Sequence, residues 1–315
     1  MSEILTSDYA RRLLPARPAD SHKGSFGKVL VIAGSLHYPG AASLACSGAA
    51  RVGAGLVTLG AGRTVLAAAT RTPEITLLPL PEGDWGAVGP GAVEELGKRL
   101  DGYAALLIGP GLGTADPTKE FVQRLFGLDK QKARTRVGFL AVPDTETSNE
   151  PKLPSLPPTV LDADALNILA TIDNWWERLP RSQLVLTPHP GEMRRLFKDE
   201  EPPGDAVTAA TTAAARWGQV VVLKGATTVI AAPDGRALKH EQGNPALATA
   251  GTGDVLAGAI AGLLAQGLQP YDAAALAVYL HAAAGARVRD ELGDAGALAS
   301  DLLPELPRAI KALKQ

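Results

Sequence analysis

The sequence has very little cysteine and few aromatic side chains. Cys46 is the only cysteine among 315 residues, and Phe, Trp and Tyr together make up 4% of the chain. A single thiol allows neither an intramolecular disulfide nor a thiolate metal cluster. Cys46 stands among alanines in a helical pattern, which is typical of a small buried side chain. None of His22, His37 and His240 has a zinc-ligand spacing with it.

The chain also lacks an excess of charge of either sign. Its formal net charge is −2, so its overall electrostatics favour neither nucleic acid nor an anionic membrane. The basic run Lys130, Lys132, Arg134 and Arg136 is typical of a solvated loop. The first 24 residues contain no apolar signal segment, and no apolar run is long enough to span a bilayer. We therefore expect a cytoplasmic protein.

The sequence contains instead a repeated alternation of short apolar runs and Ala-rich helical stretches. Strands are expected at 28–33, 56–59, 75–80, 104–108, 160–162, 183–186, 220–223, 227–231 and 237–241. Helices are expected at 9–14, 40–55, 93–100, 118–126, 163–169, 191–197, 206–217, 254–265 and 272–288, the last two closing the chain. This alternation predicts an α/β fold, with a mostly parallel sheet and helices on both faces.

The alternation is interrupted between Gly127 and Pro158. This stretch holds the basic run, a candidate strand at 137–142, and a segment rich in Pro, Ser, Thr and acids. Such a composition predicts a loop or hairpin excursion rather than a linker between domains. We expect one domain over 1–315 with an insertion at about 127–158.

A glycine-rich turn leads into the helix expected at 254–265. Gly251 and Gly253 can take positive φ, and Thr252 or Asp254 can cap the helix, whose positive dipole end faces the same spot. This combination suits an anion such as phosphate, and Asp254 at its mouth could accept a proton from an attacking hydroxyl. An N-capped helix without chemistry explains the same residues.

Two further motifs follow expected strands. Asp162 would face the crevice at the strand ends and could organise metal or phosphate, whereas Asp164 could be the N-cap of the next helix. In the segment TPHPGE, two prolines fix the entry to a helix, with His189 displayed at the strand end and Glu192 in the first turn. A turn histidine and a carboxylate that complements the helix dipole are the plain alternatives.

Three other features have weaker implications. The segment Lys224, Gly225, Ala226, Thr227 and Thr228 joins two strands and could hold a phosphate or a ribose, although a plain hairpin explains it equally well. The turn at 109–113 has the wrong spacing for a dinucleotide fingerprint and is better explained as a strand-end loop that lines a pocket. His281 lies in an apolar helical stretch and is expected to be buried and structural.

In this order, the segments resemble one known family. The segments that carry the resemblance are KVLVIAGS, IGPGLG, VLDADALN, LTPHPGE, VVLKGATTVIA and GNPALATAGTGDVLAGAIAGLLAQG. From about Ser21 to Gly293, the chain resembles the ADP-dependent (S)-NAD(P)H-hydrate dehydratases of the ribokinase-like superfamily. The resemblance implies a ribokinase-like, three-layer α/β/α fold. It also implies a lyase that repairs hydrated NADH and NADPH, using ADP or ATP. The ring hydroxyl of the S epimer would be phosphorylated and then eliminated as phosphate.

The resemblance also assigns roles to individual residues. Asp254 would accept the hydroxyl proton, and Gly251, Thr252 and Gly253 would form the anion hole. The residues that would bind the nucleotide are Lys224, Gly225, Ala226, Thr227, Thr228 and Gly253. The hydrated coenzyme would contact Ala41, Gly111, His189 and Asp254, and Glu192 would organise Mg²⁺ through water.

His189 occupies a position where kinases of the superfamily have Asn, which favours a dehydratase. A small-molecule kinase that phosphorylates a vitamin-type alcohol is the alternative. The resemblance further implies a homo-oligomer, a tetramer. Because only about 20 residues precede the first motif, we expect a separate NAD(P)H-hydrate epimerase to work beside this protein. The insertion is longer than the family pattern and would reshape the substrate mouth or an oligomer contact.

Overall fold

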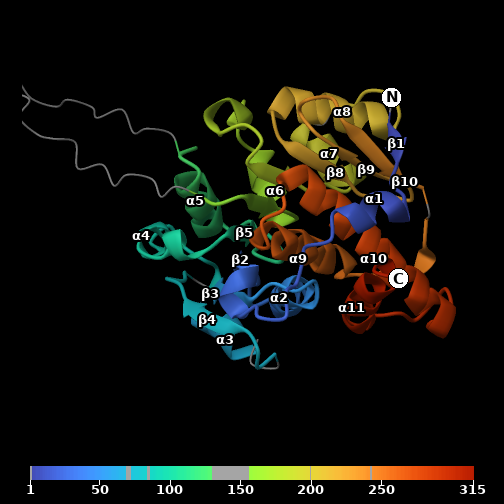
Figure 1. Ribbon diagram of the computed structural model, residues 1–315. Helices are drawn as coiled ribbons and strands as arrows, with labels where there is room; N and C mark the ends of the chain where they lie inside the picture. The colour runs from blue at the N-terminus through green and yellow to red at the C-terminus, as the bar shows by residue number, and fades with distance from the viewer. Residues whose placement is uncertain (1, 69–71, 84–85, 130–155, 199, 242) are drawn as a thin grey trace, which may run out of the picture.

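In the computed structural model, one ten-stranded sheet runs through the residues described, which are 2–68, 72–83, 86–129, 156–198, 200–241 and 243–315 (Figure 1). The strand order is β1-β10-β9-β8-β7-β6-β5-β2-β3-β4, and all neighbouring pairs are parallel except β8–β9 and β9–β10. The strands are β1 Glu3–Ile4, β2 Lys28–Ile32, β3 Leu56–Ala61, β4 Thr76–Pro79, β5 Ala105–Ile108, β6 Thr159–Leu161, β7 Leu184–Leu186, β8 Val220–Leu223, β9 Thr228–Ala231 and β10 Ala237–His240.

Helices cover both faces of this sheet (Figure 1). They are α1 Ser7–Arg12, α2 Pro39–Arg51, α3 Arg63–Ala68, α4 Ala92–Gly97, α5 Asp116–Leu125, α6 Asp164–Leu169, α7 Pro190–Leu196, α8 Ala206–Trp217, α9 Thr252–Ala265, α10 Pro270–Leu292 and α11 Leu302–Leu313. No helix in these described ranges is long and apolar enough to cross a membrane.

The two faces of the sheet bury two separate hydrophobic cores. In β2, Val29 and Val31 belong to the core beneath α2, α9, α10 and α11, whereas Leu30 and Ile32 belong to the core beneath α4 to α8. Successive side chains of a strand point to opposite faces, so a continuous apolar run fills both cores. The predicted three-layer α/β/α architecture is confirmed.

Helix α9 lies directly against α2, because small residues let the two backbones approach. A Cβ at Gly258 would lie 2.0 Å from the carbonyl oxygen of Ala45, and one at Gly48 would lie 2.4 Å from that of Val255. No side chain fits at these points. The close contact fixes the first turn of α9 relative to the sheet, which places the glycine-rich turn.

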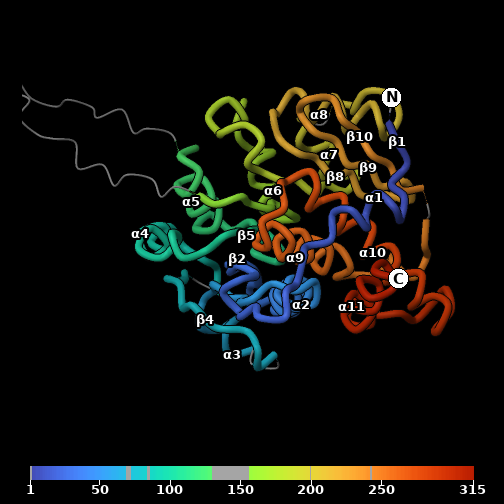
Figure 2. The backbone as a smooth tube through the Cα atoms, in the orientation of Figure 1, coloured from blue at the N-terminus to red at the C-terminus, as the bar shows by residue number. Residues whose placement is uncertain are grey.

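The end of the chain differs from the prediction. Helix α10 does not close it, because α11 follows and packs beside α2 and α10 (Figure 2). The prolines Pro304 and Pro307 interrupt the helical sequence pattern of α11, so the sequence did not predict this helix. Its buried face is formed by Leu302, Leu306, Ala309 and Leu313. Proline is tolerated in a first turn but removes a hydrogen bond farther on. The short elements β1 and α3 were also not predicted.

The remaining predicted helices and strands are found within a few residues of their expected bounds. The candidate strand at 137–142 lies outside the described residues. The same holds for the expected loop with the basic residues Lys130, Lys132, Arg134 and Arg136.

Candidate functional site

Polar side chains gather where β6, β7 and β8 end, beside the first turn of α9. Asp162 directly follows β6, Thr187 follows β7, and Lys224 follows β8. The ends of neighbouring parallel strands meet at one edge of a sheet, which is where open α/β folds bind ligands. The sequence places charged groups at these ends, and the structure brings them into contact.

Asp162 and Lys224 form a buried ion pair at the centre of this edge. Asp162 is 1% exposed, and its Oδ1 accepts hydrogen bonds from Lys224 Nζ at 2.8 Å and from Thr187 Oγ1 at 2.7 Å. Glu192 Oε2 lies 4.0 Å from the same ammonium. Burial lowers the pKa of Lys224, but the carboxylates of Asp162 and Glu192 outweigh this effect and raise it. Lys224 therefore carries its charge.

Glu192 and His189 form a reciprocal cap at the start of α7. The backbone N–H of His189 donates to Glu192 Oε2 at 2.8 Å, and His189 Nδ1 accepts from the N–H groups of Gly191 and Glu192 at 3.0 and 3.3 Å. The predicted position of Glu192 in the first turn is confirmed. Its pKa is raised by burial. His189 is the N-cap, and its imidazole is half exposed, 50% by area.

The glycine-rich turn begins α9 without a side-chain cap, so the predicted capping by Thr252 or Asp254 is wrong. Gly251 is the N-cap, with φ at 93°, and a Cβ there would lie 2.5 Å from Leu44 Cδ1. Thr252 Oγ1 instead donates to the carbonyl oxygens of Leu247 and Thr249 at 2.9 and 3.1 Å. Within the described residues, no protein acceptor faces the N–H groups of Gly253 and Asp254.

Asp254 lies half-buried in the field of the other acids. Burial raises its pKa to about 7, with Asp162, Asp164 and Glu192 adding to the rise and Lys224 opposing it. A carboxyl group with this pKa exchanges its proton near neutral pH, which suits a general base. Lys224 Nζ lies 3.4 Å from the position of a Cβ on Gly253. Asp254, the two amides without a protein acceptor and one cation therefore lie close together.

Asp164 does not cap its helix, so this alternative for it is wrong. Ala163, with φ at 49°, is the N-cap of α6, and Asp164 Oδ2 accepts a hydrogen bond from the Gly113 N–H at 2.8 Å. The contact ties the turn at 109–113 to the acid cluster. Asp164 also borders an open hollow of about 370 Å³, lined besides by Thr114, Lys119, Asn167, Ile168, Thr171 and Arg195. The turn at 109–113 itself is not among the residues that line this hollow, so its predicted place in a pocket stays a prediction.

The other predicted contact residues lie in two places. Ala41 and Gly111 are neighbours, since a Cβ on Gly111 would lie 2.9 Å from Ala41 Cβ. Gly225, Ala226, Thr227 and Thr228 form the β8–β9 hairpin, as the plain alternative held, and Thr228 Oγ1 donates to the Gly225 carbonyl at 3.2 Å. The hairpin also lies beside Gly243, which precedes the glycine-rich turn in the chain, because a Cβ on Gly243 would lie 3.4 Å from Ala226 Cβ.

The family model described as NAD(P)H-hydrate dehydratase matches residues 29–308. The chain belongs to the NAD(P)H-hydrate dehydratase family. It is 42% identical to the bifunctional NAD(P)H-hydrate repair enzyme Nnr of Moorella thermoacetica over 99% of this chain and 54% of that protein. An ADP-dependent (S)-NAD(P)H-hydrate dehydratase of Neisseria meningitidis serogroup B is 38% identical, over 92% of this chain and 86% of that one.

A solved dehydratase gives the same picture of the fold. The ADP/ATP-dependent NAD(P)H-hydrate dehydratase of Bacillus subtilis, co-crystallised with ATP/Mg²⁺, matches with a TM-score of 0.76 and 31% identity, over 99% of both chains. The fold is thus ribokinase-like, as predicted. The chain spans about half the length of the first bifunctional relatives, 52–54% of each.

Within this dehydratase fold, two contact residues had no predicted part in the site. Thr187 donates to Asp162, and its place in the TPHPGE segment was the available signal. His281 is buried, as predicted, and its Nε2 lies 2.9 Å from the carbonyl oxygen of Thr252 at the start of α9. Only the fold could reveal that contact, because α10 supplies the ring and α9 the carbonyl.

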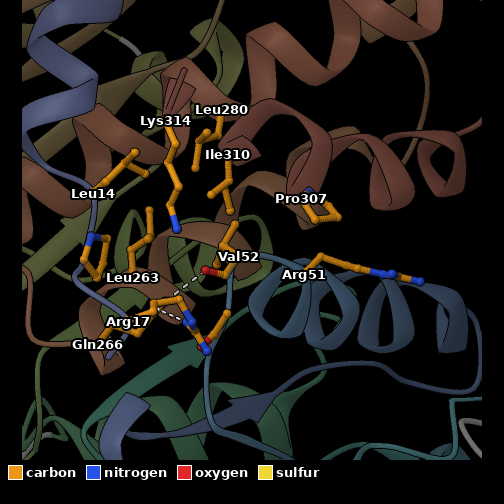
Figure 3. A pocket seen from close by; sticks show the side chains of 12 residues that line it. Leu14, Arg17, Arg51, Val52, Leu263, Gln266, Leu280, Pro307, Ile310 and Lys314 are labelled. Atoms are coloured by element: carbon orange, nitrogen blue, oxygen red, sulfur yellow. Dashed lines mark hydrogen bonds between the residues drawn. The ribbon is translucent and has the colours of Figure 1, made fainter. Parts of the chain in front are cut away.

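A second hollow lies at the opposite end of α9. It has a volume of about 190 Å³, and its walls include Val52, Leu263 and Ile310, with Arg17 donating to Gly53 O and Gln266 Oε1 beside it (Figure 3). Leu263 lies in the last turn of α9 and Gln266 is its C-cap. At a rise of about 1.5 Å per residue, about 14 Å of helix separates Leu263 from Asp254. It takes no part in the site at the strand ends.

Proposed function

We propose that this protein dehydrates the S epimer of hydrated NADH and NADPH, driven by ADP or ATP. The observation that carries the proposal is the placement of Asp254, the free N–H groups of the first turn of α9, and the Lys224 ammonium around one space. A group that accepts a proton from a hydroxyl thus lies beside groups that hold a phosphoryl anion. Membership of the dehydratase family supports the same reaction.

The chemistry needs both parts because hydroxide is a poor leaving group. Asp254 takes the proton of the ring hydroxyl while the hydroxyl oxygen attacks the terminal phosphorus of the nucleotide. The bond from that phosphorus to the nucleotide's bridging oxygen breaks. The ring nitrogen then expels phosphate, and loss of a proton from the adjacent ring carbon restores the double bond. With ADP, the balanced products are the reduced coenzyme, AMP and phosphate.

The remaining assignments follow from this geometry and the family resemblance. Gly251, Thr252 and Gly253 form the anion hole. The nucleotide lies along the β8–β9 hairpin from Lys224 to Thr228, and the hydrated ring contacts His189 and the neighbouring pair Ala41 and Gly111. A positively charged Lys224 beside the hole supports its placement next to the nucleotide phosphates.

The acids at the site fit a magnesium ion that keeps most of its water. Within the residues described, no three His, Cys, Asp or Glu side chains are arranged to hold a metal. Mg²⁺ needs fewer, because one or two carboxylates plus water and substrate phosphates complete its shell. Glu192, buried with one oxygen near Lys224, would hold it through water. The ion would neutralise phosphate charge during transfer.

The larger organisation is part of the proposal. Residues 1–315 would form one dehydratase domain with an insertion at about 127–158. The protein would act in the cytoplasm as a homotetramer, together with an NAD(P)H-hydrate epimerase. Light scattering of the purified protein tests the assembly, since a monomeric mass would reject the tetramer.

Incubation of the protein with hydrated NADH, Mg²⁺ and ADP tests the reaction. Absorbance of the reduced nicotinamide should recover as AMP and phosphate appear in equal amounts. Turnover of a vitamin-type alcohol in place of the hydrated coenzyme would reject the dehydratase and identify a small-molecule kinase. Parallel runs with ADP and ATP, and with both coenzymes, determine the preferences.

A further inference from the structure

His281 lies deep in α10 and reaches across to the first turn of α9. His281 is only 8% exposed, and its Nε2 lies 2.9 Å from the carbonyl oxygen of Thr252. Burial lowers the pKa of the ring to about 4, so the imidazole is neutral at physiological pH. A carbonyl oxygen can only accept, so the proton of the neutral ring is on Nε2 and His281 is the donor.

This hydrogen bond acts on a group that the site uses. The carbonyl of Thr252 and the N–H of Gly253 belong to one planar peptide unit, and in a trans peptide they point in opposite directions. Fixing the carbonyl oxygen from the α10 side therefore fixes the direction of the Gly253 N–H on the other side. Among the described residues no protein acceptor meets that N–H, and Gly253 itself lies beside Lys224, whose Nζ would be 3.4 Å from a Cβ on Gly253.

Glycines flank Thr252 at the start of α9. Gly251 takes a positive φ that favours glycine, and the Thr252 carbonyl lies in the first turn of the helix, so the His281 N–H adds a second constraint on this peptide from outside α9. Helix α10 contacts the segment a second time, one turn after His281. A Cβ at Gly285 would lie 2.6 Å from Leu247 Cδ2, and Leu247 provides a carbonyl for the Thr252 hydroxyl. Helix α10 thus supports the whole turn.

We propose that His281 is a positioning residue that aims the Gly253 N–H at the phosphoryl group during transfer. The proposal rests on the dehydratase function for the use of the hole, but the orientation of the peptide does not depend on which hydroxyl is phosphorylated. His281 touches neither substrate nor nucleotide and acts through the Thr252 peptide. Its effect should therefore appear in kcat and in the binding of a nucleotide's terminal phosphate, and should spare the binding of the hydrated coenzyme.

Two substitutions separate positioning from packing. His281→Gln keeps an N–H donor at about the reach of Nε2, whereas His281→Leu fills the space with no donor. Removing a direct donor from an oxyanion hole costs about 10²- to 10³-fold in kcat. Misaiming one should cost less, so we expect His281→Leu to lower kcat about 10- to 100-fold with KM for the hydrated coenzyme changed less than threefold. His281→Gln should stay within about fivefold of wild type.

Val288→Ala is the matched control, because Val288 is a buried residue of α10 with an apolar side chain. It should lower the thermal midpoint without changing kcat at a temperature where the protein is folded. A His281→Leu variant with wild-type kcat would overturn the proposal, as would a His281→Gln variant impaired as severely as the leucine variant.

A binding measurement keeps the inference testable apart from the dehydratase reaction. The hole would receive the terminal phosphate of ADP, which AMP lacks. Calorimetric titration should give a preference for ADP over AMP that falls in His281→Leu and persists in His281→Gln. If wild type fails to restore the coenzyme but shows this pattern, the positioning role stands without the dehydratase function. An unchanged preference in the leucine variant rejects the positioning role.

Discussion

Replacing Asp254 with Asn should make the protein more stable above neutral pH while removing the proposed proton acceptor. The carboxyl group of Asp254 is partly buried among other acids, and its pKa is about 7 instead of 3.8. Ionising this group in the folded protein is therefore unfavourable. Asn has nearly the same shape and no charge, so the Asp254→Asn variant avoids that penalty.

The size of the effect follows from the difference between the folded and unfolded pKa. Below about pH 4, Asp254 is protonated in both states and the favourable contribution of its proton is complete. As pH rises from about 4 to 7, the unfolded state loses the proton first, so wild-type stability falls; above about pH 7 this loss levels off. The full shift of about three pH units corresponds to about 4 kcal/mol.

Partial access to water screens the Asp254 charge, so we expect about 2–4 kcal/mol above pH 7. With an unfolding entropy of about 2 cal/mol/K per residue, a chain of 315 residues should gain about 3–6 °C in Tm.

Thermal unfolding of ligand-free wild type and Asp254→Asn between pH 5 and 8.5 measures this. The stability advantage of the variant should grow up to about pH 7 and then stay constant. Asp205→Asn is the control of opposite sign, because the Thr208 N–H holds the pKa of Asp205 below its usual range. A Tm difference for Asp254→Asn that is the same at pH 5 and pH 8 would refute the reasoning.

Three substitutions test other parts of the site. Lys224→Met leaves Asp162 as an unpaired buried acid and should lower the free energy of unfolding by about 3 kcal/mol in urea titrations; a loss below about 1 kcal/mol would argue against the buried pair. Gly251→Ala puts a Cβ 2.5 Å from Leu44 Cδ1 at φ 93° and should cost about 1–3 kcal/mol and weaken ADP binding in calorimetry; unchanged affinity would separate this turn from the phosphate. Gly111→Ala meets the Tyr38 and Ala41 side chains and should raise KM for the hydrated coenzyme while ADP affinity stays constant; an equal loss of both would place this turn elsewhere.

The alternating layers could be predicted because the relevant signals are local. Apolar runs such as β2 and Ala-rich stretches such as α2 carry their own periodicity. Strand β1 has two residues and forms only by pairing with β10, so no local pattern announces it. Helix α11 has an amphipathic face, but two prolines interrupt its sequence pattern. In both, tertiary packing decides the conformation.

The site was predictable to the extent that parallel strands bring their ends together. Asp162 follows β6 and Lys224 follows β8, and these parallel strands flank β7, so their ends lie at the same edge of the sheet. The sequence could not say that Lys224 pairs with Asp162, that Gly251 rather than Thr252 is the N-cap, or that His281 binds the Thr252 carbonyl. Each depends on side-chain directions across elements that are distant in the chain.

Recovery of the reduced coenzyme by wild type and Asp254→Asn tests the central claim most directly. With hydrated NADH, Mg²⁺ and ADP, wild type should restore the absorbance of the reduced nicotinamide. Asp254→Asn should restore none above background, although calorimetry should find its ADP affinity within a few-fold of wild type. Failure of the wild-type protein to restore the coenzyme, or recovery at the wild-type rate by Asp254→Asn, would contradict the account.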